Sequence, residues 1–332
     1  MSSLSLTPCI QPNPDISGIG VRASIYAQAF LSLACLFIFV IDGEITSEEG
    51  LAINDIHMTN ELTASALLVS AVIQARTYGL SIYHANIVLI LSWINFVPTY
   101  FIGAIINALV HGTNPTEGRP KFRWRKGWKG FLARLFQWIH YIAVAGFGIW
   151  VWSDVGSFGD QPQCTPQTFV VIFGFNILVT NPGLKIAALI LYSFFAFVGI
   201  VMVPFLTLIR SRHCERLLPR IYKHFQLVLP ENNRNLTQKQ KQSEWMITLV
   251  ATFSIEILFV FSTEVLIRRS KGLVYPGESQ WTFGQSLAIS LVLAPLAGTI
   301  EELQKGYQGL REKRKKRKES QDDELPMINH ES

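Results

Sequence analysis

The chain has 332 residues, of which 49% are hydrophobic and only 16% are charged, and its mean hydropathy is +0.28. A soluble domain carries about 25% charged residues, so this composition excludes a soluble globular protein and indicates a membrane protein. The net charge of +5 does not indicate nucleic-acid binding, because the basic residues stand in the gaps between long apolar runs. We therefore expect the lipid bilayer as the main partner, and no nucleic acid.

Residues 1–22 form a turn-rich segment before the first apolar run. Pro12-Asn13-Pro14-Asp15 combines two fixed φ angles with an Asp that can bond the next backbone N–H groups, which predicts a turn. Asp15 and Arg22 are seven residues apart, so they would pair across two turns if this segment is helical. No secretory signal is indicated, and we expect the first apolar run to remain in the mature chain.

Long apolar runs predict an all-α integral membrane protein, because a spanning helix needs about 20 apolar residues. A doubtful run, Leu62–Ala75, reaches about Gly79 only by including Gln74 and Arg76. A shorter apolar segment, Phe169–Val179, predicts a β-rich or re-entrant piece at the membrane face. The six clear spans are Ala23–Ile41, Ile82–Val110, Phe131–Trp152, Leu184–Ile209, Trp245–Ile267 and Phe283–Ile300.

The positive-inside rule orients this bundle. With seven helices and the N-terminus outside, the cytoplasmic side would hold 23 of the 29 Lys and Arg residues, in or beside the segments 111–130, 210–244 and 301–332. This predicts a cytoplasmic C-terminus. If Leu62–Ala75 does not span, the alternative is six helices with the N-terminus inside, and the acidic gap 42–61 then faces outward.

The cysteines bear on the same alternative. In the seven-helix arrangement Cys9 and Cys164 both face outside, where an oxidising compartment permits a disulfide. In the six-helix arrangement they lie on opposite sides and cannot pair. The sequence thus predicts three parts: an outer N-terminal segment 1–22, a transmembrane bundle 23–300 and a cytoplasmic tail 301–332.

The tail is first polybasic and then acidic. A basic cluster directly after a membrane helix predicts contact with anionic lipid headgroups on the cytoplasmic leaflet, worth about 1 kcal/mol per residue near the surface. From Glu319 onward we expect disorder. The candidate lipid contacts are Lys313, Arg314, Lys315, Lys316, Arg317 and Lys318.

Glu256 is the most informative polar residue, because it lies near the centre of the run Trp245–Ile267. An ionisable group at that depth costs at least about 2.5 kcal/mol and by default marks a functional position. It predicts a cation or proton site, or a counter-ion for a ligand. The alternative is a protonated Glu that hydrogen-bonds a neighbouring helix. The candidate partners are Asn86, Asn95, Gln28 and His140.

Catalytic and cofactor motifs are missing from the sequence. It contains no H-E-x-x-H, C-x-x-C, G-x-S-x-G or Walker A spacing, so we expect no enzymatic role and no cofactor. Two hypotheses remain for a multi-pass protein of the plasma membrane or an internal membrane. One is a channel- or transporter-like protein with Glu256 on its path. The other is a seven-helix receptor or sensor whose basic loops, 111–130 and 210–244, contact cytoplasmic partners.

The N-terminal pattern N-P-D-I-S-G-I-G-V-R-x-S-x-Y-x-Q, from Asn13 to Gln28, resembles one found in uncharacterised multi-pass membrane proteins of fungi. The later W-T-F-G-Q of Trp281–Gln285 is similar to part of the same pattern. The resemblance covers these two stretches and the helix layout between them. It implies a fungal source and a polytopic fold, and it implies no activity.

Overall fold

The computed structural model describes residues 7–42, 47–111, 128–202 and 238–324, and close to the gaps it describes the backbone alone. The chain is mostly helical there. By length and composition, six helices can cross a membrane, in agreement with the predicted multi-pass helical protein. The candidate spans are Pro14–Phe37, Asp55–Thr77, Leu135–Ser153, Pro182–Val201, Gln242–Ser270 and Phe283–Glu301. The doubtful run at 62–79 thus falls almost wholly inside one of them.

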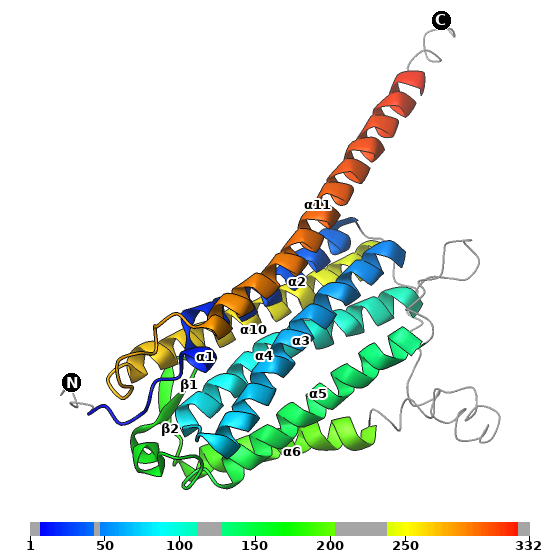
Figure 1. The fold of residues 1–332 in the computed structure, drawn as a ribbon. Coiled ribbons are helices and arrows are strands. Elements are labelled where there is room, and N and C mark those ends of the chain that lie inside the picture. The colour runs from blue at the N-terminus through cyan, green and yellow to red at the C-terminus, as the bar shows by residue number, and fades with distance from the viewer. Residues whose placement is uncertain (1–6, 43–46, 112–127, 203–237, 325–332) are drawn as a thin grey trace, which may run out of the picture.

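The long helices of the described chain lie side by side as one bundle (Figure 1). A seventh helix, α4, is 30 residues long, but its apolar described part, Ile82–Pro98, is shorter than the six candidate spans. The bounds are α2 Ile19–Asp42, α3 Ser47–Thr77, α4 Ile82–His111, α5 Trp128–Ser153, α6 Pro182–Phe197, α10 Gln238–Ser270 and α11 Phe283–Glu324.

α4 is the core helix of the bundle. It packs against α2, α3, α5 and α10, and all its side chains from Ile82 to Leu89 are buried. A helix that is buried all round belongs to the interior of the fold. By contrast, α6 exposes Ile186, Ile190 and Phe194, an outward apolar face that suits contact with lipid.

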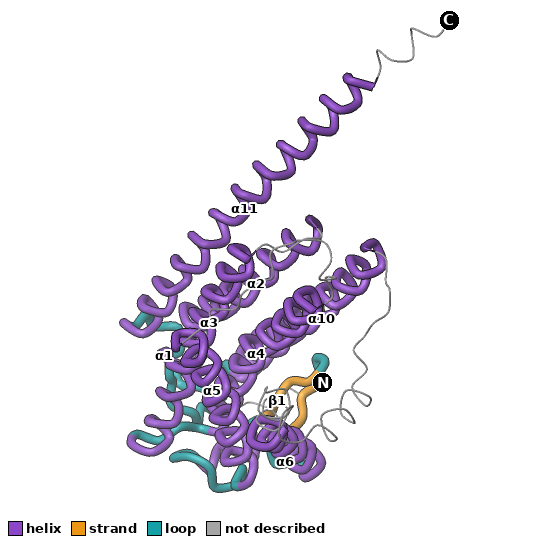
Figure 2. The backbone as a smooth tube through the Cα atoms, turned by 90° about the vertical axis from the view of Figure 1, so that its right-hand side faces the viewer, coloured by secondary structure: helices purple, strands orange, loops and turns teal. Residues whose placement is uncertain are grey.

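A small β-hairpin forms at the end of the bundle where α6 begins. Strand β1 (Phe169–Ile172) pairs antiparallel with β2 (Phe175–Leu178), and the 3-10 helix η2 (Pro162–Gln167) precedes them. β1 packs against α10, and the hairpin lies beside that helix in Figure 2. The β-rich alternative for Phe169–Val179 is therefore confirmed.

The N-terminal segment is more helical than expected. A short helix, α1 (Pro14–Ser17), starts with Pro at its first position, where the missing N–H is tolerated. α2 then begins at Ile19, so the expected boundary between 22 and 23 falls inside a helix. Pairing of Asp15 with Arg22 is also wrong as a prediction: Asp15 Oδ1 accepts from Thr282, and Arg22 pairs with Glu264.

Two further segments expected to be non-helical are helical in the structure. The gap 42–61 is helical from Ser47 onward, because α3 extends well before its apolar part. α11 continues past the other helices to Glu324 (Figure 1), so it includes residues 319–324, which were expected to lie in the disordered part of the tail. Lys, Arg, Glu and Gln are good helix formers, which accounts for a helix in so polar a tail.

Candidate functional site

Glu256 lies midway between Gln242 and Ser270, the two ends of the candidate span in α10. Its side chain is fully buried, and neither carboxyl oxygen has a hydrogen-bond partner among the described residues. Ring contacts hold α10 on either side of it: Phe253 packs edge-on against Phe30 of α2, and Phe259 stacks on Trp93 of α4. Glu256 is thus a buried carboxyl at the centre of the membrane helix.

The other predicted members of this site do not join Glu256 through any hydrogen bond in the described structure. Gln28 donates to Thr63 Oγ1 at 3.2 Å and accepts from Asn60 through its backbone carbonyl, which links α2 to α3. Asn86 donates to Ile82 O of its own helix at 2.9 Å. Asn95 is buried on α4. The hydrogen bonds of Gln28 and Asn86 thus stay within one helix or join neighbouring helices, as is usual for such side chains in membranes. A shared polar site around Glu256 remains a prediction.

His140, proposed from sequence as a partner of Glu256, faces α3 instead. Its Nδ1 is 2.8 Å from Ser65 Oγ, and its Nε2 is 4.0 Å from Glu61 Oε1. Glu61 and Ser65 were not predicted as partners of His140, because residue 61 falls in a gap between apolar runs. The available signal was their i, i+4 spacing, which puts both on one face of a helix.

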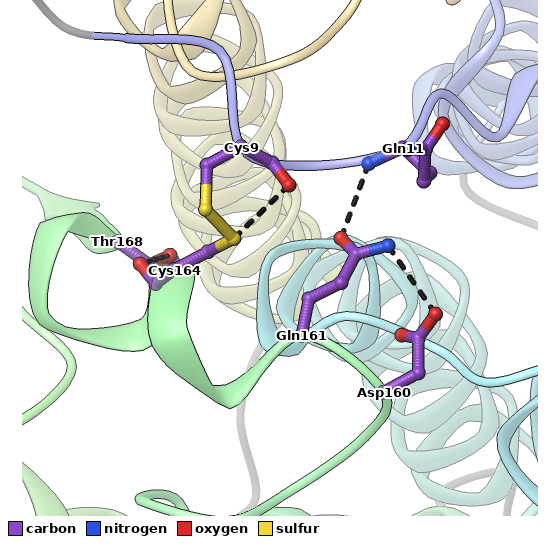
Figure 3. The surroundings of a disulfide bond; sticks show 6 residues. All are labelled: Cys9, Gln11, Asp160, Gln161, Cys164 and Thr168. Atoms are coloured by element: carbon purple, nitrogen blue, oxygen red, sulfur yellow. Dashed lines mark hydrogen bonds between the residues drawn. A yellow bond between two sulfur atoms is a disulfide. The ribbon is translucent and has the colours of Figure 1, made fainter.

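The predicted pair Cys9 and Cys164 forms a disulfide that ties the N-terminal segment to η2 (Figure 3). Next to it, the backbone N–H of Gln11 donates to Gln161 Oε1 at 3.1 Å. The same segment pairs with the loop between α10 and α11, since Tyr275 N donates to Ile10 O at 2.9 Å. We call this end of the bundle the disulfide end.

Glu278, in the α10–α11 loop, gathers the polar contacts of the disulfide end. His84 Nε2 of α4 is 3.0 Å from Glu278 Oε1, and Asn13 N donates to Glu278 Oε2 at 2.9 Å. Ser17 donates to the same carboxylate. Burial alone would raise the pKa of Glu278, but the hydrogen bond and charge of His84, with the donors at Ser17 and Asn13, hold it below its ordinary value. Glu278 is therefore an ionised carboxylate that links three segments: the N-terminal segment, α4 and the α10–α11 loop.

The two stretches that carry the family resemblance contact each other at this end. Gln285 Oε1 accepts from Gly20 N at 2.9 Å, and Thr282 donates to Asp15. An added Cβ at Gly20 would lie 2.7 Å from Gln285 Cβ, so only glycine allows α2 this close to α11. The N-terminal segment thus covers the disulfide end and binds the start of the last helix.

A small recess, with a cavity volume of only about 20 Å³ and partly open to the surroundings, lies between α4, α5 and α6. Its walls are mainly aromatic, and the Trp93 indole donates to the Tyr192 hydroxyl at 3.1 Å. Gly148 of α5 makes room for the Tyr192 ring, because a Cβ there would lie 2.4 Å from that ring. The lining residues are Ser92, Trp93, Phe96, Tyr141, Val144, Ala145, Tyr192 and Phe195.

The remaining predicted sites are only partly within the described structure. α11 includes the backbone of Lys313–Lys318, while the side chains of these candidate lipid contacts lie outside what is described. Most of the basic segments 111–130 and 210–244 also lies outside it. Among the described residues, no group of three His, Cys, Asp or Glu side chains is placed to hold a metal ion.

No protein-family model matches this chain, and comparison with curated proteins and with solved structures finds no similar chain.

Proposed function

We propose that the chain is a channel- or transporter-like multi-pass membrane protein that moves a proton or small cation, with Glu256 as its intramembrane binding group. The observation that carries this proposal is the full burial of Glu256 at mid-helix, with both carboxyl oxygens unpaired within the described structure. Ionisable residues inside membrane helices mark ion pathways and proton relays.

The free-energy cost of a buried charge favours reversible binding of a proton or a cation at the Glu256 carboxyl. An ionised and unpaired carboxylate in an apolar interior is too costly to persist, so the group either holds a proton or binds a cation. A Glu kept only for helix packing would be expected to hydrogen-bond a neighbouring helix, as Gln28 does with Thr63. Both carboxyl oxygens of Glu256 instead remain available to bind a proton or a cation.

We further propose seven spans, with the N-terminus outside and the C-terminus in the cytosol. The disulfide supports this, because its two cysteines must lie on one side of the membrane. Four helices, α2 to α5, separate Cys9 from Cys164, and only an even number of crossings returns the chain to the same side. α4 must then cross as well, which its 30-residue length allows.

Flux measurements on Glu256→Gln test the proposal. The purified protein is reconstituted in vesicles loaded with a pH-sensitive or a potassium- or sodium-sensitive dye, and a membrane potential is imposed. We expect flux in the wild type and a reduction of about tenfold or more in the variant, the factor that about 1.4 kcal/mol of lost binding produces. Glu244→Gln, an exposed Glu on the same helix, is the matched control and should retain flux.

The alternative function is a seven-helix receptor or sensor that contacts cytoplasmic partners through the basic segments 111–130 and 210–244. The aromatic recess between α4, α5 and α6 has room for only about one water molecule, so it does not provide a ligand site. The same experiment separates the two. Absence of flux in the wild type, or flux that Glu256→Gln leaves unchanged, contradicts the transport proposal. A receptor would instead bind its ligand without flux and pass the signal to partners through the basic loops.

A further inference from the structure

A second buried acid faces a histidine between α3 and α5. The side chains of Glu61 and His140 are only 8% and 5% exposed, and Glu61 Oε1 is 4.0 Å from His140 Nε2. Ser65, one turn after Glu61, has its hydroxyl 2.8 Å from the other ring nitrogen, Nδ1. Three groups able to hold or pass a proton thus meet inside the bundle.

We infer that Glu61 and His140 form a proton-binding pair within the membrane, with Ser65 as the group that orients the histidine ring. At 4.0 Å the two charges attract, but the distance exceeds that of a hydrogen bond. The pair is therefore not a closed ion pair. It gains one proton as Glu61–COOH with neutral His140, or as Glu61–COO⁻ with His140⁺, and it returns to Glu61–COO⁻ with neutral His140 when the proton leaves.

The Ser65 hydroxyl suits both protonation states of the ring. A hydroxyl can donate or accept, and its hydrogen rotates to suit its partner. When His140 is neutral with its proton on Nε2, Ser65 donates to Nδ1; when the ring is protonated, Nδ1–H donates to Ser65. Neither state leaves Nδ1 without a partner, so a change of protonation costs no hydrogen bond on that side.

The depth of the pair links it to Glu256. Glu61 is six residues, or about 9 Å, from the start of the candidate span Asp55–Thr77, and His140 is five residues from the start of Leu135–Ser153. Both spans start at the end of the bundle opposite the disulfide end. His84 and Glu278 stand at the disulfide end, and Glu256 stands midway. Protonatable groups thus occur at three depths. On the proposed function, on which this step rests, the ion that moves is a proton.

Several other titratable groups lie on the helices around Glu61 and His140. Cys35 of α2 lies 3.3 Å from Thr299 of α11, and His84 of α4 is held by Ser81 and Glu278. Tyr192 of α6 accepts from Trp93. His57, one turn before Glu61 on α3, and Tyr83 at the start of α4 are also buried. Tyr141 of α5 is partly buried, and its ring packs on Phe96.

Infrared difference spectroscopy tests the pair without any flux assay. Spectra of the full chain in lipid nanodiscs are recorded at pH 5 and pH 8, in H₂O and in D₂O. We expect a protonated-carboxyl band that is lost in Glu61→Gln, is changed in frequency or pH range in His140→Gln, and survives in Glu244→Gln. A wild-type spectrum that Glu61→Gln leaves unchanged, or a Glu61 band indifferent to His140→Gln, would overturn the inference.

Ser65→Ala keeps the test decisive if the larger changes prevent folding. It removes one oxygen and should alter the ¹⁵N signals of the His140 ring, identified by their loss in His140→Gln or by selective labelling; unaltered signals count against the inference. Failure here is distinct from failure of the proposed function. A flux that depends on Glu256 without a Glu61 band refutes only the pair, whereas a Glu61 band in a protein without flux refutes only the transport.

Discussion

Glu278 shows at the residue scale how the disulfide end depends on one carboxylate. Its pKa is held below the ordinary value, so its contribution to stability is fully present above about pH 4.5 and is lost as the pH falls through the lowered folded-state pKa. We expect Glu278→Gln to lower the free energy of unfolding by about 1–3 kcal/mol at pH 7, because charged hydrogen bonds at Asn13 and Ser17 are weakened.

The pH dependence separates this carboxylate from an ordinary surface acid. Thermal unfolding in detergent between pH 7 and pH 3.5 should show the wild type and Glu278→Gln converging toward the acid end. Asp154→Asn, an exposed acid at the same end of the bundle, should unfold like the wild type throughout. A gap between wild type and Glu278→Gln that stays constant across this range would contradict the assignment.

At the element scale, the contact of α2 with α11 depends on small residues. A Cβ at Gly20 would stand 2.7 Å from Gln285 Cβ, closer than real Cβ contacts occur, so the helices would have to separate. We expect Gly20→Ala to cost about 1–3 kcal/mol, the usual range for overpacking, and Gly20→Val to cost more. Thermal melts in detergent measure both.

Gly146 supplies the control for this prediction. It lies within α5, and a Cβ there meets nothing within 4 Å. Since Ala is a better helix former than Gly by about 1 kcal/mol, Gly146→Ala should be neutral or stabilising. If Gly20→Ala behaves like Gly146→Ala, close packing of α2 on α11 does not contribute to stability.

The elements also show what a single sequence can reveal. Apolar length predicted five of the six candidate spans clearly and the sixth, at 62–79, only as a doubtful run. The short run that ends before Asn181-Pro182-Gly183 predicted the hairpin. The first part of α3 was not predicted as a helix, because it packs through polar residues that hydropathy assigns to a loop. One of them is Asn60, whose side chain hydrogen-bonds to α2. Pairs such as Arg22 with Glu264 could not be predicted, since they join residues 242 apart, and one sequence carries no information on such distances.

The proposed site was predictable only in part for the same reason. Glu256 could be found, because an acid within a long apolar run is conspicuous in any sequence. Its surroundings could not, because helix rotation decides which side chains meet. His140 turns toward Glu61 and Ser65, and Gln28 turns toward Thr63, and in neither case does spacing along the chain distinguish these partners from Glu256.

For the whole molecule, the disulfide and the proposed seven spans lead to one orientation. Cys9 and Cys164 should lie on the outer side, where oxidising conditions maintain their bond. α11 then carries its polybasic stretch Lys313–Lys318 into the cytosol, in agreement with the bias of Lys and Arg. A chain with six spans would separate the two cysteines and leave the disulfide impossible.

Labelling of sealed cells can decide this orientation. In a Cys35→Ser, Cys214→Ser background, only Cys9 and Cys164 remain. We expect a membrane-impermeant reductant followed by an impermeant maleimide to label both from outside, and the maleimide alone to label neither, because the disulfide blocks them. A tag after residue 332 should be cleaved by protease only in permeabilised cells. Labelling of Cys9 from the cytosolic side alone would rule out both the outer N-terminus and the seven-span arrangement, since Cys9 precedes the first crossing.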